Sequence, residues 1–137
     1  TNTPREFLAL CGVVGLGQLL AAGQTSELNR LREYANDPRW RMREGVCMAL
    51  QRYGQQDTGS LIDEMEQWST GTLLERRAAA CALCHPDLLK DQPYTERTIR
   101  LLSEITETIL EEPDRRSDEF KALRKGMGYC LLFEFNH

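Results

Sequence analysis

The sequence predicts an all-α protein of roughly seven helices. Apolar residues recur at three- and four-residue spacings along most of the 137 residues, and this period is typical of amphipathic helices. Nowhere do apolar and polar residues alternate with β-branched side chains over five or more positions, so no strand is expected. Turn residues interrupt the helical pattern and divide it into helices of ordinary length.

Capping and turn residues set the boundaries of the first three helices. Pro4 suits the first turn of the first helix, and Gly23 ends that helix. Ser26 is expected to cap the second helix. The Asn-Asp-Pro sequence at 36–38 forms the turn before the third helix, which Gly54 ends.

Similar signals divide the second half of the chain. Thr58 or Ser60 opens the fourth helix, and Pro86 follows the end of the fifth. Pro113 ends the sixth helix, and Ser117 caps the seventh. The seven helices are therefore expected at 4–22, 26–35, 39–53, 58–68, 72–84, 93–112 and from 117 toward the C-terminus.

Two apolar stretches raise the question of a membrane role. No charged residue lies between Phe7 and Ser26, but the apolar part of this stretch, 7–22, is shorter than the roughly 20 residues that span a bilayer. We interpret it as a core helix and expect no membrane role. The seventh helix ends on an apolar run from Tyr129 to Phe135. Such an end is expected to continue a longer array, to fold back over the core or to pair with a second copy of the chain.

Two segments of the chain match each other at an offset of 33 residues. Residues 42–50 and 75–83 both carry an arginine, small residues and a final Ala-Leu, and Leu28 falls on Leu61 at the same offset. Each unit is a helix, a tight turn and a second helix, and small residues such as Gly45 allow neighbouring helices to approach closely. Because a helix pair cannot bury its apolar face alone, such pairs stack into a solenoid.

The repeated unit resembles the HEAT repeat, chiefly in residues 37–44. In that family an Asp opens the turn and an Arg early in the second helix ties the repeats together, so the resemblance implies these roles for Asp37, Arg43 and Arg76. In the second unit, Ser-Thr-Gly at 69–71 replaces the Asp-Pro turn of the family. The series of Asp–Arg contacts that links successive repeats in the family is therefore expected to be incomplete in this chain. The implied fold is a right-handed α-α superhelix of about three helix pairs in one domain over 1–137, complete or cut from a longer array, with its clearest repeats at 26–55 and 58–86.

The resemblance also suggests a binding surface, because the second helix of each HEAT pair lines the concave face. Helical spacing places polar and soft apolar side chains on the outward stripe of these helices. We therefore expect a non-enzymatic protein-interaction module, a scaffold that binds a protein partner through this face. The candidate binding residues are Arg41, Met48, Arg52, Arg77 and Cys81.

Nucleic acid is the alternative partner. Residues 1–56 carry a net charge of +2 and residues 57–137 a net charge of −6, and the pI is near 5.3. The repeats also resemble those of HEAT-like DNA-alkylation-repair glycosylases, which implies an Asp beside aromatic residues in a basic groove; Asp37 near Trp40 is the nearest match. The net acidity disfavours binding to nucleic acid.

The five cysteines show no disulfide framework, so we expect free thiols in a reducing, cytoplasmic compartment. Cys81, Cys84 and His85 formally match a c-type haem attachment motif, but they lie at the end of an Ala-rich helix and are expected to be core or groove residues. A zinc site would lack ligands, since the only other histidine is His137. No cofactor, metal or nucleophilic catalytic set is predicted.

Overall fold

A computed structural model describes the backbone of residues 4–85 and 92–135, and the side chains within these ranges except Glu6, Gln92 and 128–135. The described residues form seven α-helices, one short 3₁₀ helix and no strand, which confirms the predicted all-α class and the number of helices. The helices are α1 (Pro4–Ala21), η1 (Thr25–Glu27, the 3₁₀ helix), α2 (Leu28–Ala35), α3 (Trp40–Gln56), α4 (Thr58–Trp68), α5 (Leu73–Leu83), α6 (Gln92–Glu111) and α7 (Asp118–Phe135).

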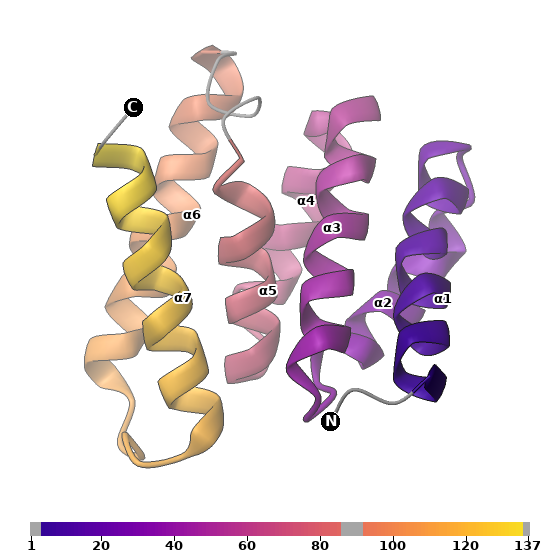
Figure 1. The fold of residues 1–137 in the computed structure, drawn as a ribbon. Coiled ribbons are helices and arrows are strands. Elements are labelled where there is room, and N and C mark those ends of the chain that lie inside the picture. The colour runs from indigo at the N-terminus through magenta and orange to yellow at the C-terminus, as the bar shows by residue number, and fades with distance from the viewer. Residues whose placement is uncertain (1–3, 86–91, 136–137) are drawn as a thin grey trace.

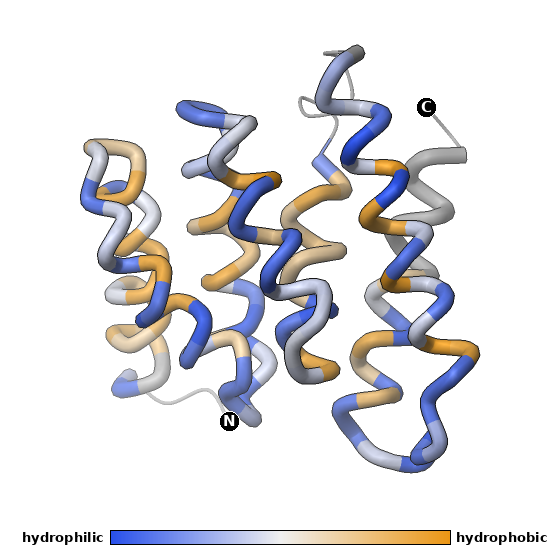
Figure 2. The backbone as a smooth tube through the Cα atoms, turned by 180° about the vertical axis from the view of Figure 1, so that it is seen from behind, coloured by the Kyte–Doolittle hydropathy of each residue, from blue (hydrophilic) through white to orange (hydrophobic). Residues whose placement is uncertain are grey.

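Consecutive helices alternate between two layers (Figure 1). α1, α3, α5 and α7 form one layer, in which each helix contacts the next, and α2, α4 and α6 lie behind them. Seen from behind, the tube shows hydrophilic and hydrophobic stretches alternating along the helices (Figure 2), as expected of helices that bury one face. The core lies between the layers and includes the fully buried side chains of Leu50, Leu61, Ile62, Met65, Trp68, Leu83, Ile105 and Leu123.

The predicted cap of the second helix is wrong, whereas the fourth helix begins at Thr58 as predicted. Ser26 lies inside η1, and Glu27, which precedes α2, forms no side-chain cap bond. Asp57 is the cap of α4, because its carboxylate accepts a hydrogen bond from the Ser60 backbone amide at 3.1 Å. An aspartate at this position is as good a cap as serine.

The two glycines predicted to end helices behave differently. Gly23 has a φ of +98°, and it ends α1 as predicted. Gly54 does not end its helix, since α3 continues to Gln56. A glycine inside a helix costs only about 1 kcal/mol relative to alanine, and Gly54 is a buried position within α3.

Small residues bring α1 and α3 together. A Cβ atom on Gly17 would lie 2.7 Å from Cα of Ala49, and one on Gly45 would lie 2.9 Å from Cδ1 of Leu10 and 3.2 Å from Cγ1 of Val13. The backbones therefore approach so closely that only hydrogen fits at position 17. The uncharged stretch predicted to be a core helix is buried on this side, but its opposite side is exposed, with Phe7 58% and Leu8 69% accessible. No helix within the described residues has the length and hydropathy of a membrane span.

The two repeated arginines make equivalent bonds in their own turns. Arg43 donates from Nη1 to the backbone carbonyls of Asp37 and Pro38, both at 3.0 Å, and Arg76 donates from Nε to the carbonyl of Gly71 at 3.1 Å. The Asp37 carboxylate instead binds Arg39, at 2.9 and 3.0 Å. These arginine bonds fasten each turn to its following helix, and none of them joins one repeat to the next.

A different residue, Glu75, joins the two clearest repeats. Its Oε1 accepts from Nε of Arg32 at 2.7 Å and its Oε2 from Nδ2 of Asn36 at 2.8 Å, although the residue is only 7% exposed. Thr72 completes the group, since its hydroxyl donates to Oδ1 of Asn36 at 2.5 Å and accepts from the Glu75 amide at 3.1 Å as the cap of α5. Gly71 leaves room for this carboxylate, because a Cβ there would overlap Oε1 of Glu75.

Replacement of Gly17 should destabilise the protein, whereas the same change at Gly12 should not. Gly17→Ala forces α1 and α3 apart and is expected to cost about 1–3 kcal/mol of unfolding free energy. A Cβ on Gly12 meets no atom within 4 Å, so Gly12→Ala should stabilise by about 0.5–1 kcal/mol through helix propensity. Urea denaturation of both variants tests this; equal stabilities would show that the close approach is absent.

The carboxylate of Glu75 should make stability depend on pH. Burial alone would raise its pKa, but the hydrogen bonds from Asn36 and Arg32 and the charge of Arg32 hold the pKa below its ordinary value of 4.5. A lowered folded-state pKa stabilises the protein above pH 4.5, and this contribution is lost as the pH falls through the folded-state value.

We therefore expect Glu75→Gln to reduce the unfolding free energy by about 1–3 kcal/mol at pH 7, with a difference that shrinks below about pH 4.5. Urea unfolding of both proteins between pH 7 and pH 3 measures it. The exposed Glu107→Gln serves as the control and should follow wild type. A Glu75→Gln deficit that stays constant over this range would contradict the assignment.

Candidate functional site

A surface pocket of about 440 Å³ lies where α3, α5 and α7 meet. Its residues come from three helices that are far apart in the sequence but adjacent in one layer (Figure 1). The lining combines an aromatic ring, three cations, one carboxylate and two small residues. These are Trp40, Arg43, Glu44, Arg77, Ala122, Lys125 and Gly126.

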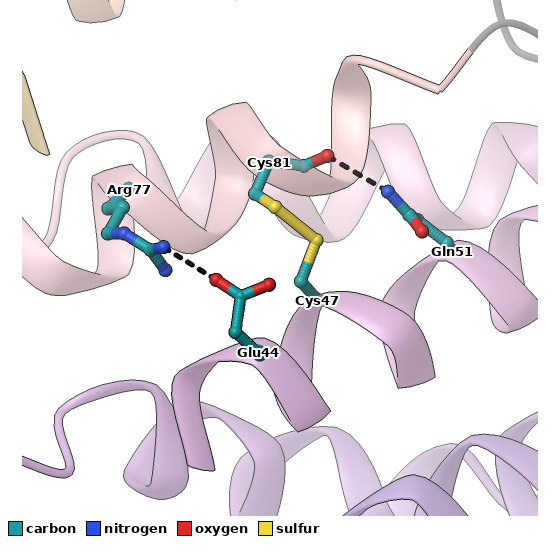
Figure 3. Close-up of a disulfide and its surroundings, with 5 residues drawn as sticks. All are labelled: Glu44, Cys47, Gln51, Arg77 and Cys81. Carbon is teal, nitrogen blue, oxygen red and sulfur yellow. Dashed lines mark hydrogen bonds and ion pairs between the residues drawn. A yellow bond between two sulfur atoms is a disulfide. The ribbon is translucent and has the colours of Figure 1, made fainter. Parts of the chain in front are cut away.

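An ion pair spans the pocket between α3 and α5. Arg77 donates from Nη2 to Oε1 of Glu44 at 2.8 Å (Figure 3), and the Arg77 side chain is only 15% exposed. The two residues are 33 apart and so occupy matching positions in the two repeats. α7 covers the aliphatic part of Arg77, because a Cβ on Gly126 would lie 3.3 Å from its Cγ. Arg77 is therefore held in place on two sides.

An exposed tryptophan forms another wall. Trp40 is 59% accessible, and the guanidinium carbon of Arg41 lies 5.4 Å from the centroid of its ring. This distance is within the range of a cation–π contact. Arg41, a predicted binding residue, thus packs against the indole of Trp40. The Nε atom of Arg41 is buried and has no hydrogen-bond partner among the described residues.

Arg43 serves both its turn and the pocket. Besides donating to the two turn carbonyls, it lines the pocket beside Arg77. Burial lowers the pKa of Arg43 below its ordinary value, and the charge of Arg77 lowers it further, while Asp37, Glu44 and Glu119 act in the opposite direction. The pocket therefore concentrates positive charge that its one lining carboxylate, Glu44, only partly neutralises.

The structure brings some of the predicted binding residues together and leaves others apart. Of the five, only Arg77 lines the pocket, and Arg41 contacts its tryptophan wall. Met48 and Arg52 are exposed on α3 outside the pocket lining, and Met48 is 54% accessible. Cys81 faces α3 and is covalently bonded to it.

The prediction of free thiols is wrong for three cysteines. Cys47 on α3 and Cys81 on α5 form a disulfide (Figure 3), and Cys84 is also disulfide-bonded, whereas Cys11 is free and exposed. The amide of Gln51 reinforces the link by donating to the Cys81 carbonyl at 3.2 Å. Disulfides persist in oxidising compartments, so the expectation of a cytoplasmic location loses its basis in the cysteines.

The same bonds bear on the haem and metal motifs. Cys81 and Cys84 are both bonded as disulfides and offer no thiols for thioether attachment of haem. Among the side chains that the structure describes, His, Cys, Asp and Glu form no cluster of three or more that could hold a metal ion.

Sequence reasoning missed the part of the pocket that α7 contributes. Ala122, Lys125 and Gly126 lie in a helix outside the recognised repeats, and only the stacking of α7 on α5 brings them to Arg77. The apolar run 129–135, which was expected to continue a longer array, to fold back over the core or to pair with a second copy, lies outside the residues whose side chains are described.

Comparisons of the chain with protein-family models, with curated proteins and with solved structures found no match.

Loss of the disulfide should destabilise the fold. The bond closes a loop with a sequence separation of 34, and a crosslink of this kind contributes about 2–4 kcal/mol. We expect the double variant Cys47→Ala/Cys81→Ala to lose about that much unfolding free energy in urea denaturation. Cys11→Ala, which removes an exposed free thiol, should match wild type. An unchanged stability of the double variant would mean that the bond does not constrain α3 and α5.

Proposed function

We propose that this chain is a non-enzymatic protein-interaction module of the HEAT-like solenoid type. Its binding surface is the exposed side of the layer formed by α3, α5 and α7. The pocket with Trp40 at its rim is the observation that supports this proposal. Tryptophan and arginine are the residue types that most often dominate the energy of protein–protein interfaces.

The exposed residues around the pocket extend this surface along α3. Met48 lies two helical turns beyond Trp40 and is exposed, and Arg52 follows one turn later. A flexible methionine adapts to partners of different shape, and exposed arginine adds charge for orientation. A partner segment lying along α3 would contact the pocket with one end and Met48 and Arg52 with the other.

A peptide screen tests the proposal. Peptides displayed on phage are selected on wild type and then counter-selected on Trp40→Ser, which removes an exposed ring without opening the core. Ile99→Ser is the matched control, since Ile99 is 49% exposed on α6 in the other layer. We expect peptides that bind wild type and Ile99→Ser, and that lose at least tenfold in affinity on Trp40→Ser.

Two results would contradict the proposal. One is a failure to enrich any peptide that depends on Trp40. The other is binding of duplex DNA with an affinity that falls steeply as salt rises, because this dependence is the mark of phosphate contacts. The second result would favour the alternative of a DNA-binding protein.

A further inference from the structure

The pocket between α3, α5 and α7 contains more positive than negative charge. Arg43, Arg77 and Lys125 line it from three different helices, and Glu44 is the one carboxylate among its lining residues. Glu44 is already paired with Arg77 at 2.8 Å. Lys125 is exposed and is free to turn toward a ligand at the pocket mouth.

Two arginines of the pocket keep hydrogen-bond donors without acceptors. Nε of Arg43 and Nη1 of Arg77 are buried, and neither has a partner among the described residues. Buried polar groups are nearly always hydrogen-bonded in folded proteins, so each exception calls for an explanation. Both side chains line the same pocket, but the two nitrogens are inaccessible as the side chains stand, so an oxygen acceptor from outside the chain would reach them only after the guanidinium groups turn toward the pocket.

Charge adds to the same conclusion. The pKa of Arg43 is lowered by burial and by the neighbouring charge of Arg77, which the charges of Asp37, Glu44 and Glu119 oppose. An anion between the two guanidinium groups would relieve their repulsion, and a guanidinium binds a carboxylate through charge-assisted hydrogen bonds.

We propose that this pocket binds a carboxylate of a partner protein, presented by an acidic side chain that lies next to an apolar one. The carboxylate meets Arg43, Arg77 and Lys125, and the apolar neighbour rests against Trp40. This inference rests on the proposed protein-binding function and specifies the chemistry of the partner.

The rest of the chain favours a short acidic segment over an extended polyanion. The formal charge of the whole chain is −4, so a nucleic acid would meet repulsion outside the pocket. The pocket volume of about 440 Å³ falls in the range of sites that enclose a small ligand. The exposed indole of Trp40 offers apolar contact next to the cations, which a peptide can use and a free phosphate cannot.

The probe is a short peptide of alternating leucine and glutamate with blocked ends. The control peptide has the same sequence with glutamine in place of each glutamate. Binding is followed by NMR through the Nε–H signals of Arg43 and Arg77, and by the fluorescence of Trp40. The second tryptophan, Trp68, is fully buried and should not respond. We expect the glutamate peptide to shift both arginine signals saturably and the glutamine peptide to leave them unchanged.

Charge reversal on α7 provides variants that keep the fold. Lys125→Glu alters the pocket, and Lys121→Glu makes the same change one turn earlier, outside the lining; both side chains are exposed. Lys125→Glu should weaken binding of the glutamate peptide at least tenfold, and Lys121→Glu should change it less than threefold. Backbone amide spectra of both variants should match wild type.

Three outcomes would overturn the inference: equal binding of the two peptides, equal effects of the two lysine variants, or arginine shifts produced by inorganic phosphate and not by the glutamate peptide. The last would make the pocket a phosphate site. The peptide screen distinguishes a failure of this inference from a failure of the proposed function. Selected peptides that need Trp40 for binding but contain no acidic residue would support the protein-binding function. The same peptides would overturn the carboxylate site.

Discussion

The buried carboxylate of Glu75 fixes the first of the two clearest repeats against the second. The whole residue is only 7% exposed, and a buried carboxylate is stable only when its oxygens are paired. Arg32 and Asn36 pair them from the end of α2, while Thr72 holds the backbone of α5 at the same point. The turn after α2 and the start of α5 are therefore held together by directional bonds. Apolar packing alone would specify this register less strictly, since it is non-directional.

The contacts between α3 and α5 follow from this register. With the start of α5 fixed, Glu44 meets Arg77, and Cys47 meets Cys81 one turn further on. Gln51 then reaches the carbonyl of Cys81 in the next turn (Figure 3). An ion pair, a covalent bond and a hydrogen bond thus succeed one another along the same seam. The pocket opens at the end of the seam that carries the ion pair, where α7 packs over Arg77.

The sequence predicted the helices well, because helix boundaries depend on local signals. Gly23 ended α1 through its own backbone conformation, and Ser117 accepts a hydrogen bond from the Phe120 backbone amide at the start of α7, as expected of a cap. The repeated arginines were also recognisable, since Arg43 and Arg76 bind equivalent carbonyls in their own turns. The assigned partner of Arg43 was less accurate: the backbone of Asp37 accepts its bond, while the Asp37 carboxylate binds Arg39.

Contacts between repeats could not be predicted in the same way. At the offset of 33, the position equivalent to Glu75 is Met42, a fully buried apolar residue, so no repeated pattern marks the carboxylate as a tie. The pairing of Cys47 with Cys81 depends on the distance between two helices, which spacing along the chain does not reveal. The pocket needed a third helix, α7, whose likeness to the repeats is too weak to align.

Two arginines, one in each layer, differ in the partners that they have. On α6, Arg97 donates to Asp63 at 2.7 Å and to Glu66 at 2.8 Å, and these hydrogen bonds raise its pKa. On α3, the pKa of Arg43 is lowered, and one of its buried nitrogens has no acceptor. An arginine with two carboxylates gains little from a further anion, whereas an arginine with an unmatched buried donor gains a hydrogen bond once its guanidinium group turns toward an acceptor. The layer of α3, α5 and α7 is therefore the side on which an acidic partner would gain most.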